Sequence, residues 1–183
     1  MSDLYSHLSQ TQSNTYLIDE TDRQFLRFHL HKGTKAMLPI KQITEVLKIQ
    51  FSQIVPIPQM PAWVMGVHNW RGDVLWTIDL AHLIGFEPWY QKSINHANHT
   101  AIVLSPNKEQ KDNVQNNIHL GLVVSQVEDI EMCNVADIQI PPSSVTAQLA
   151  SFLDGYWLRS SGVPIIVLNG HSIVAAMPNN LVH

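Results

Sequence analysis

The chain has 183 residues, of which 45% are apolar and only 14% are charged, and its formal net charge is −4. This apolar content is enough for a packed core, and the low charge argues against a disordered polyelectrolyte. Because electrostatic binding to nucleic acid needs a basic surface, we expect no nucleic-acid partner. The single cysteine, Cys133, excludes an internal disulfide and a zinc site built on paired cysteines.

Residues 1–21 are rich in Ser, Gln, Thr and Asn and contain no apolar stretch of the kind found in a secretory signal. We expect this segment to be a flexible leader. No apolar run approaches the roughly 18 residues of a membrane span. The sequence therefore predicts a cytoplasmic globular protein without direct membrane insertion.

The first predicted element is a strand at 25–30, where apolar and polar residues alternate. A turn at 32–34 and a returning strand at 36–40 complete a hairpin. A short apolar segment follows at 43–47. Three prolines between residues 56 and 61 then force an extended connection.

A second hairpin is predicted where apolar runs at 63–67 and 74–78 flank a polar turn. Asp79 and the spacing of the residues after it indicate one short capped helix. Residues 87–99 are polar and include Pro88 and several Asn and His, which is typical of a linker.

The second half of the chain repeats the pattern of the first. Offsets of 84 and about 90 residues align strand-like segments and single residues. The aligned pairs are 36–40 with 120–124, 75–79 with 165–169, Gly66 with Gly155, and Arg71 with Arg159. We interpret the chain as two copies of one small β unit, each too small to hide its apolar face alone.

Short strands separated by turns, with little helix, predict a mainly β fold with few short helices, arranged as two small barrel-like lobes. We expect one domain at 22–178. Within it, lobe one should span about 22–86, the linker about 87–99 and lobe two about 100–178.

The histidines are the first candidates for reactive chemistry. His29 and His31 are two residues apart on one expected strand, so they share a face and could reach one metal ion. His96 and His99 lie in the polar linker. Because neither pair has a third ligand nearby, we expect no metal site and no cofactor. Cys133 has no neighbour that would lower the pKa of its thiol, so we expect it to be inert.

Signatures of catalysis are absent from the sequence: there is no GxSxG, no Gly-rich phosphate loop and no HExxH. Asp73 and Asp79 flank a strand, and a turn residue and a helix cap explain them better than an acid–base pair. We therefore predict no catalytic residues and no enzymatic activity. A hydrolase, as an alternative class, would depend on His68 or Asp79.

Three of the five tryptophans, Trp63, Trp70 and Trp76, gather around the second hairpin. Core packing is the default for each of them. Trp70, however, directly precedes Arg71 in a turn, and Trp and Arg are the residue types that dominate protein–protein hot spots. The sequence leaves a core role and an interface role for Trp70 open.

Glu45 and Arg71 each carry a charge in a stretch that is otherwise apolar. Such a charge must reach solvent or find a partner. If the two segments are neighbours, a bidentate Arg–carboxylate bridge would hold the turn in place. A purely structural ion pair and a rigid docking surface are both compatible with this pattern.

A longer motif runs through the second hairpin. Its residues are Pro56, Pro58, Pro61, Trp63, Val64, Gly66, Val67, Asn69, Arg71, Gly72, Val74, Leu75, Ile78, Asp79 and Leu80. This run resembles the signature of CheW-like domains. The strand at 25–30, the segment at 38–40 and Glu45 lie where that family has its opening hairpin and its glutamate, so the resemblance spans roughly residues 24–176. Trp70 stands where the family usually has a smaller aliphatic residue.

The resemblance implies two five-stranded, SH3-like β barrels with a hydrophobic groove between them. It also implies a non-catalytic adaptor in the signal transduction that controls motility. Such adaptors link the cytoplasmic tip of methyl-accepting chemoreceptors to the regulatory domain of a chemotaxis-type histidine kinase, and they are recruited to receptor arrays at the membrane.

Residue roles follow from the resemblance by position in the motif. Glu45 and Arg71 would form the bridged pair needed for receptor coupling, and Val46 would line the receptor side. The partner-interface hairpin would contain Gly66, Asn69, Trp70 and Gly72. The alternative function that remains open is a small-molecule or metal-sensing β domain that uses the cleft between the lobes.

Overall fold

The structure is a computed structural model, and it describes residues 21–31, 33–88, 98–104, 118–159 and 162–178. The expected leader, His96 and most of the expected linker lie outside the described residues. Among the described residues, no helix is both long enough and apolar enough to cross a membrane.

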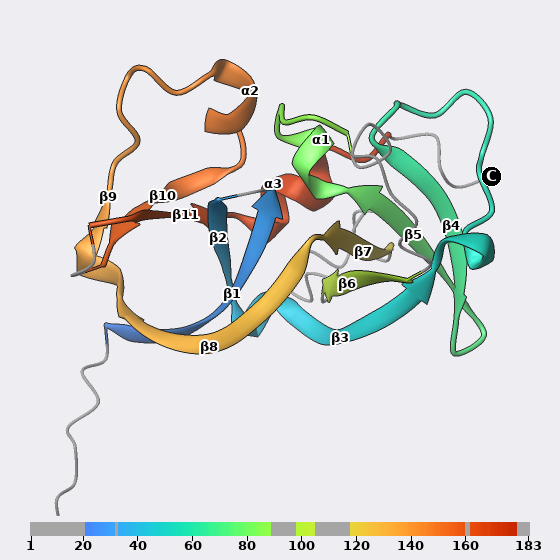
Figure 1. Ribbon diagram of the computed structural model, residues 1–183, viewed down its shortest axis with the longest axis horizontal. Helices are drawn as coiled ribbons and strands as arrows, with labels where there is room; N and C mark the ends of the chain where they lie inside the picture. The colour runs from blue at the N-terminus through green and yellow to red at the C-terminus, as the bar shows by residue number, and fades with distance from the viewer. Residues whose placement is uncertain (1–20, 32, 89–97, 105–117, 160–161, 179–183) are drawn as a thin grey trace, which may run out of the picture.

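Two β-sheets make up most of the structure (Figure 1). Sheet A has the strand order β8 (Gln126–Asn134), β1 (Asp22–His31), β2 (Thr34–Pro39), β11 (Pro164–Leu168), β10 (Leu153–Leu158) and β9 (Ile138–Gln139). Sheet B has the order β3 (Ile43–Gln50), β6 (Asn98–Leu104), β7 (His119–Val124), β5 (Asp73–Asp79) and β4 (Val64–Trp70). The predicted mainly β class is confirmed. The expected five strands per lobe hold for sheet B, whereas the two-residue β9 gives sheet A a sixth strand.

Helical segments are short, as expected. The α-helices are α1 (Leu80–Leu83), α2 (Ala147–Ala150) and α3 (Gly170–Ala175), and the 3-10 turns are η1 (Ile40–Gln42), η2 (Phe51–Gln53) and η5 (Val135–Asp137). Asp79 caps α1 by accepting a hydrogen bond from the amide of His82 at 3.2 Å. This is the role that the sequence predicts for Asp79, and it explains why the helix begins directly after β5.

Each sheet takes strands from both halves of the chain. β1 and β2 belong to the first half, but they pair with β8 and β11 from the second half. Reciprocally, β6 and β7 lie between β3 and β5. The expected lobes at 22–86 and 100–178 therefore do not coincide with the two sheets. The halves exchange their opening strand pairs, so neither half can complete a sheet by itself.

The internal repeat is present in three dimensions. A register shift interrupts the β4–β5 pairing next to Gly66, and an equivalent shift interrupts the β10–β11 pairing next to Gly155. After the second strand of each hairpin, Asp79 caps α1 and Asn169 caps α3. One parallel strand pair occurs in each sheet, β5 with β7 and β11 with β2. The sequence offsets of 84 and about 90 residues therefore align equivalent structural positions.

The main hydrophobic core lies between the two sheets. Phe28 and Leu38 from sheet A pack in the same buried cluster as Ile78, Ile102 and Leu120 from sheet B. Of two smaller clusters, the one around Met37 lies on sheet A, and the one around Leu75 combines residues of sheet B with Ile54 from the segment after η2. Buried apolar side chains thus fill the space between the sheets.

Candidate functional site

The β4–β5 hairpin ends in a tight turn formed by Arg71 and Gly72. Their φ values are 56° and 94°, and the flanking residues Trp70 and Asp73 are paired across the strands. Positive φ at both central positions is the mark of a type I′ turn, which suits the twist of a two-residue hairpin. The side-chain oxygen of Asn69 accepts a hydrogen bond from the Gly72 amide at 3.2 Å. The turn therefore holds Arg71, a non-glycine residue, in a conformation that such residues rarely adopt.

Glu45 lies on β3 and its carboxylate reaches this turn. One carboxylate oxygen accepts a hydrogen bond from Arg71 Nη2, and the other accepts one from the indole Nε1–H of Trp70. The ion pair that the sequence suggested is thus present, but it is not bidentate: Arg71 binds one carboxylate oxygen and Trp70 binds the other. We call the set of Glu45, Trp70 and Arg71 the hairpin clamp.

The hairpin clamp joins the two edges of sheet B. β3 and β4 are the first and last strands in the strand order, and Glu45 on β3 contacts residues at the end of β4. The Glu45 side chain is 25% exposed, whereas that of Arg71 is 69% exposed. The carboxylate is therefore the sheltered part of the clamp and the guanidinium is the part that solvent or a partner can reach.

Trp70 is half-buried, with one part of its surface packed inside the protein and another part accessible. Its ring packs against the small sheet-B cluster around Leu75. The ring centroid of His119 lies 4.9 Å away, with 61° between the ring planes. On the outer side, the Arg71 guanidinium carbon lies 5.3 Å from the indole centroid, which is within cation–π range.

The other residues of the predicted hairpin interface differ in exposure. Gly72 and Asn69 are exposed, whereas Gly66 is buried. A Cβ atom on Gly66 would overlap the carbonyl oxygen of Val55, which crosses β4 at this point. Gly66 therefore permits a close backbone approach inside the molecule. Val46, beside Glu45 on β3, has 42% of its surface exposed.

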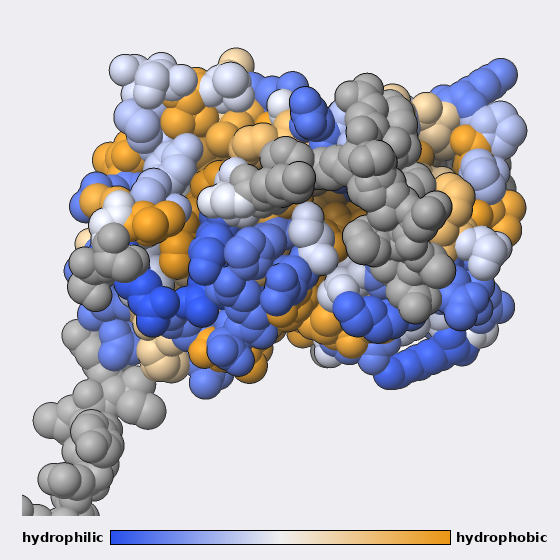
Figure 2. Space-filling model, viewed as in Figure 1, coloured by the Kyte–Doolittle hydropathy of each residue, from blue (hydrophilic) through white to orange (hydrophobic). Residues whose placement is uncertain are grey.

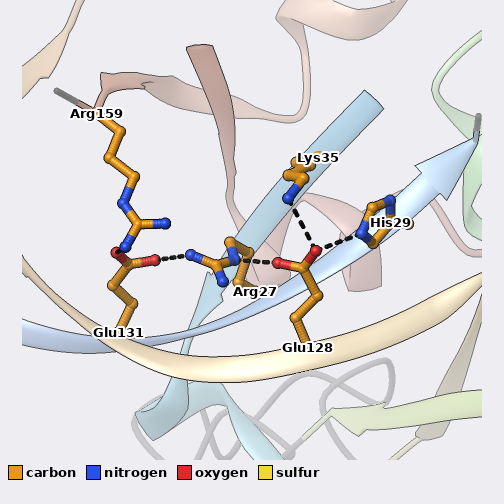
Figure 3. Close-up of polar contacts among 6 residues, drawn as sticks. All are labelled: Arg27, His29, Lys35, Glu128, Glu131 and Arg159. Atoms are coloured by element: carbon orange, nitrogen blue, oxygen red, sulfur yellow. Dashed lines mark hydrogen bonds and ion pairs between the residues drawn. The ribbon is translucent and has the colours of Figure 1, made fainter. Parts of the chain in front are cut away.

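A second polar cluster lies on sheet A, and the sequence reasoning missed it (Figure 3). Arg27 on β1 donates to both Glu128 and Glu131 on β8. Lys35 and His29 also bind Glu128, and Arg159 binds Glu131 with an N–O distance of 3.1 Å. We call these six residues the sheet-A network. Hydrophilic residues also gather on the surface where β1 and β8 run side by side (Figure 2).

The electrostatics of the sheet-A network centre on Glu128. Desolvation by burial would raise the pKa of its carboxyl, but hydrogen bonds from Lys35, His29 and Arg27 outweigh burial and lower the pKa from 4.5 to about 2. Glu128 is thus a carboxylate that stays ionised with cations on both oxygens. His29 takes part in this network as a partner of Glu128, and the side chain of His31 lies outside the described residues.

The network contains a counterpart of the hairpin clamp. Arg159 follows β10, which is equivalent to β4, and it binds Glu131 on β8, which is equivalent to β3. Arg71 binds Glu45 in the corresponding place on sheet B. Each repeat therefore ties its second hairpin to a glutamate on its edge strand. The sequence offset between Arg71 and Arg159 was the only signal of this pair.

The residues considered for catalysis lie in surroundings that fit structural roles. The Cys133 thiol is buried, and burial, followed by the nearby carboxylates Asp137, Glu131 and Asp22, raises its pKa to about 11. A thiol of this kind is a poor nucleophile. Asp73 is an exposed hairpin residue, and His68 Nδ1 lies 3.4 Å from the carbonyl oxygen of Gln53.

Comparison with known proteins decides the family. The family model described as the CheW-like domain matches residues 24–177. The chain belongs to the CheW-like domain family. It is 24% identical over 156 residues to the Chemotaxis protein CheW of Treponema pallidum (strain Nichols), and the match covers 85% of each chain.

The fold agrees with a solved CheW structure. The scaffolding protein TtCheW from Thermoanaerobacter tengcongensis superposes with a TM-score of 0.63 at 23% sequence identity, covering 80% of this chain and 88% of that protein. The two sheets described above are thus the CheW-like fold. The likeness to that scaffolding protein is a likeness of fold.

Proposed function

We propose that this CheW-like domain is a non-catalytic adaptor that couples methyl-accepting chemoreceptors to a chemotaxis-type histidine kinase in the control of motility. Family membership supports the chemotaxis role. The observation that carries the coupling role is the hairpin clamp, in which a sheltered carboxylate holds an exposed arginine at the tip of a tight hairpin. The adaptor works in the cytoplasm and is recruited to receptor arrays.

The receptor side is formed by Glu45, Val46 and Arg71. Arg71 uses Nη2 for Glu45, so its other guanidinium N–H groups can bind acceptors on a receptor. A side chain that is already held in one geometry loses little conformational entropy on binding. Val46 adds an exposed apolar side chain on the same strand as Glu45. Arginine is among the residue types enriched in binding hot spots.

The hairpin residues around Arg71 complete the partner interface. Asn69 and Gly72 are exposed at the turn, and their mutual hydrogen bond keeps the turn rigid. Gly66 and Trp70 support the hairpin from inside. The kinase regulatory domain binds a different surface, so that receptor and kinase can be held at the same time.

Ligand sensing in a cleft between the lobes is the weaker alternative. Buried apolar side chains from both sheets fill the space in which such a ligand would have to bind. A sensor would be stabilised by its ligand, because a ligand that binds only the folded state raises the unfolding temperature. A shift of several degrees in Tm on addition of zinc would favour it.

Titration calorimetry tests the proposed function. The protein and its Arg71→Ala variant are titrated separately with the regulatory domain of a chemotaxis-type kinase and with a soluble receptor fragment that carries the cytoplasmic tip. We expect wild type to bind both with about micromolar Kd, roughly −8 kcal/mol. Arg71→Ala should retain kinase binding and lose receptor binding. Absence of wild-type binding to either partner would contradict the adaptor role.

A further inference from the structure

We propose that Trp70 and His119 are positioning residues of the hairpin clamp: together they set the direction in which Arg71 presents its guanidinium to a partner. The consequence for docking rests on the function proposed above. Neither residue needs to touch the partner for this role.

Trp70 competes with Arg71 for the carboxylate of Glu45. Its indole N–H donates to one oxygen of Glu45, and Arg71 donates to the other oxygen through Nη2 alone. An unoccupied carboxylate would favour the two-point, bidentate geometry that arginine forms with acids. That geometry would turn the guanidinium toward β3 and use a second N–H group. Competition from the Trp70 indole therefore favours the one-point contact, which leaves other Arg71 donors free for a partner.

The indole ring also supports the guanidinium from one side. The Arg71 guanidinium carbon lies 5.3 Å from the ring centroid, a distance at which a cation is attracted to the face of an indole. The same ring is anchored inward against the Leu75 cluster. Arg71 is exposed, yet it has two fixed contacts, one to Glu45 and one to the ring of Trp70.

His119 sets the orientation of the indole. It begins β7, where it pairs with Leu75, and its ring meets Trp70 at an edge-to-face angle of 61° with a centroid distance of 4.9 Å. Its Nδ1 atom is buried and makes no hydrogen bond among the described residues. The position of the His119 ring is therefore determined by packing and not by a polar partner. Because β7 belongs to the second half of the chain, the clamp of the first half packs against a ring from the second half.

The first experiment compares Trp70→Phe, His119→Ala and His119→Phe with wild type by calorimetric titration with the soluble receptor-tip fragment. Trp70→Phe keeps an aromatic ring and removes the N–H donor, and we expect it to weaken binding roughly tenfold, which corresponds to about 1.4 kcal/mol. His119→Ala should weaken binding to a similar extent, and His119→Phe should restore it because the ring contact returns. The matched control is Trp76→Phe, which should bind as wild type. Trp76 is a half-buried tryptophan on β5 that packs against the main core. Wild-type affinity in Trp70→Phe would overturn the proposal.

A second readout needs no partner. The indole ¹H–¹⁵N resonance of Trp70 reports its hydrogen bond to Glu45, and we expect it to shift in Glu45→Gln and in His119→Ala while the other tryptophan resonances keep their positions. A Trp70 resonance that stays in place in both variants would overturn the positioning role. If wild type fails to bind the receptor tip, the proposed function is wrong, and this resonance still decides whether Trp70 and His119 position the clamp.

Discussion

Gly66 and Gly155 occupy equivalent positions in the two repeats, and each permits the close approach of a backbone carbonyl. Their φ values are 139° and 157°, and a Cβ atom on either would lie closer than 3.0 Å to the backbone carbonyl oxygen of Val55 or Gln139. Each glycine sits beside the register shift of its hairpin and lets an earlier segment of the same repeat cross the strand. The two repeats therefore share a steric requirement for glycine at this position, although few residues are identical between the halves.

Alanine at either position should destabilise the fold. At Gly66 or Gly155, a methyl group would overlap a backbone oxygen, and the residue would also have an unfavourable φ. We therefore expect the free energy of unfolding to fall by about 2–5 kcal/mol. Gly33→Ala is the matched control, because Gly33 has a φ of 81° and open space around it. It should cost only about 1 kcal/mol. Equal losses in urea denaturation for Gly33→Ala and Gly66→Ala would show that the close approach has no cost.

The exchange of strands between the sheets predicts how fragments behave. Because β1 and β2 complete sheet A, and β6 and β7 complete sheet B, residues 1–88 and 98–183 should each be largely unfolded when expressed alone. Mixed or co-expressed, they should assemble and recover the β-sheet circular dichroism of the intact chain. A cooperatively folded 1–88 fragment on its own would contradict the exchange.

The mainly β class, the hairpins and the repeat could all be predicted from the sequence, because alternation and turn residues are local signals. The pairing of strands could not. The alternation at 25–30 shows that one face is buried, but it does not show whether β8 or a strand of the first half lies next to it. The sheets therefore do not follow a division of the chain at the linker, whereas the aligned repeat segments lie on equivalent strands.

The candidate site was predictable in part. Glu45 and Arg71 stood out because each charge lies in apolar sequence, and the structure brings them together. The indole hydrogen bond of Trp70 has no sequence signal, since a tryptophan beside a turn can face either way. Arg27 was missed because polar residues that alternate with apolar ones on a strand are usually solvated, whereas its acidic partners lie about 100 residues away on β8.

Removal of Arg27 should be far more costly than removal of Arg159. The Arg27 side chain is 13% exposed and serves two carboxylates, so Arg27→Met leaves sheltered negative charges without their shared partner. We expect a loss of about 3 kcal/mol in the free energy of unfolding. Arg159 is 48% exposed and makes one bridge, and Arg159→Ala should cost less than about 1 kcal/mol. Urea denaturation of both variants measures this difference, and a reversed order would contradict the central place of Arg27.

Acid should weaken the fold through Glu128. The folded protein holds the pKa of this carboxyl at about 2, below its ordinary value of 4.5. A depressed pKa stabilises the folded state above pH 4.5, and this stabilisation disappears as the pH falls from about 4.5 toward 2. We therefore expect the unfolding free energy of wild type to drop by on the order of 2–3 kcal/mol more than that of Glu128→Gln across this interval.

Asp129→Asn is the control for the acid titration. Asp129 is exposed and lies next to Glu128 on the same strand. Asp129→Asn therefore changes the net charge by the same amount as Glu128→Gln. Asp129→Asn should retain the steep loss of stability below pH 4.5, whereas Glu128→Gln should flatten it. Identical pH profiles for the two variants would mean that Glu128 is not held ionised by the network.

Receptor-dependent kinase activity tests the adaptor role most directly. Receptor-containing membranes and a chemotaxis-type kinase are combined with wild type, with Arg71→Ala or with no adaptor, and autophosphorylation of the kinase is measured. We predict that wild type makes kinase activity depend on the receptor and that Arg71→Ala does not, although it still binds the kinase. Kinase activity that is the same with and without wild type, or full coupling by Arg71→Ala, would contradict the coupling role of the hairpin clamp.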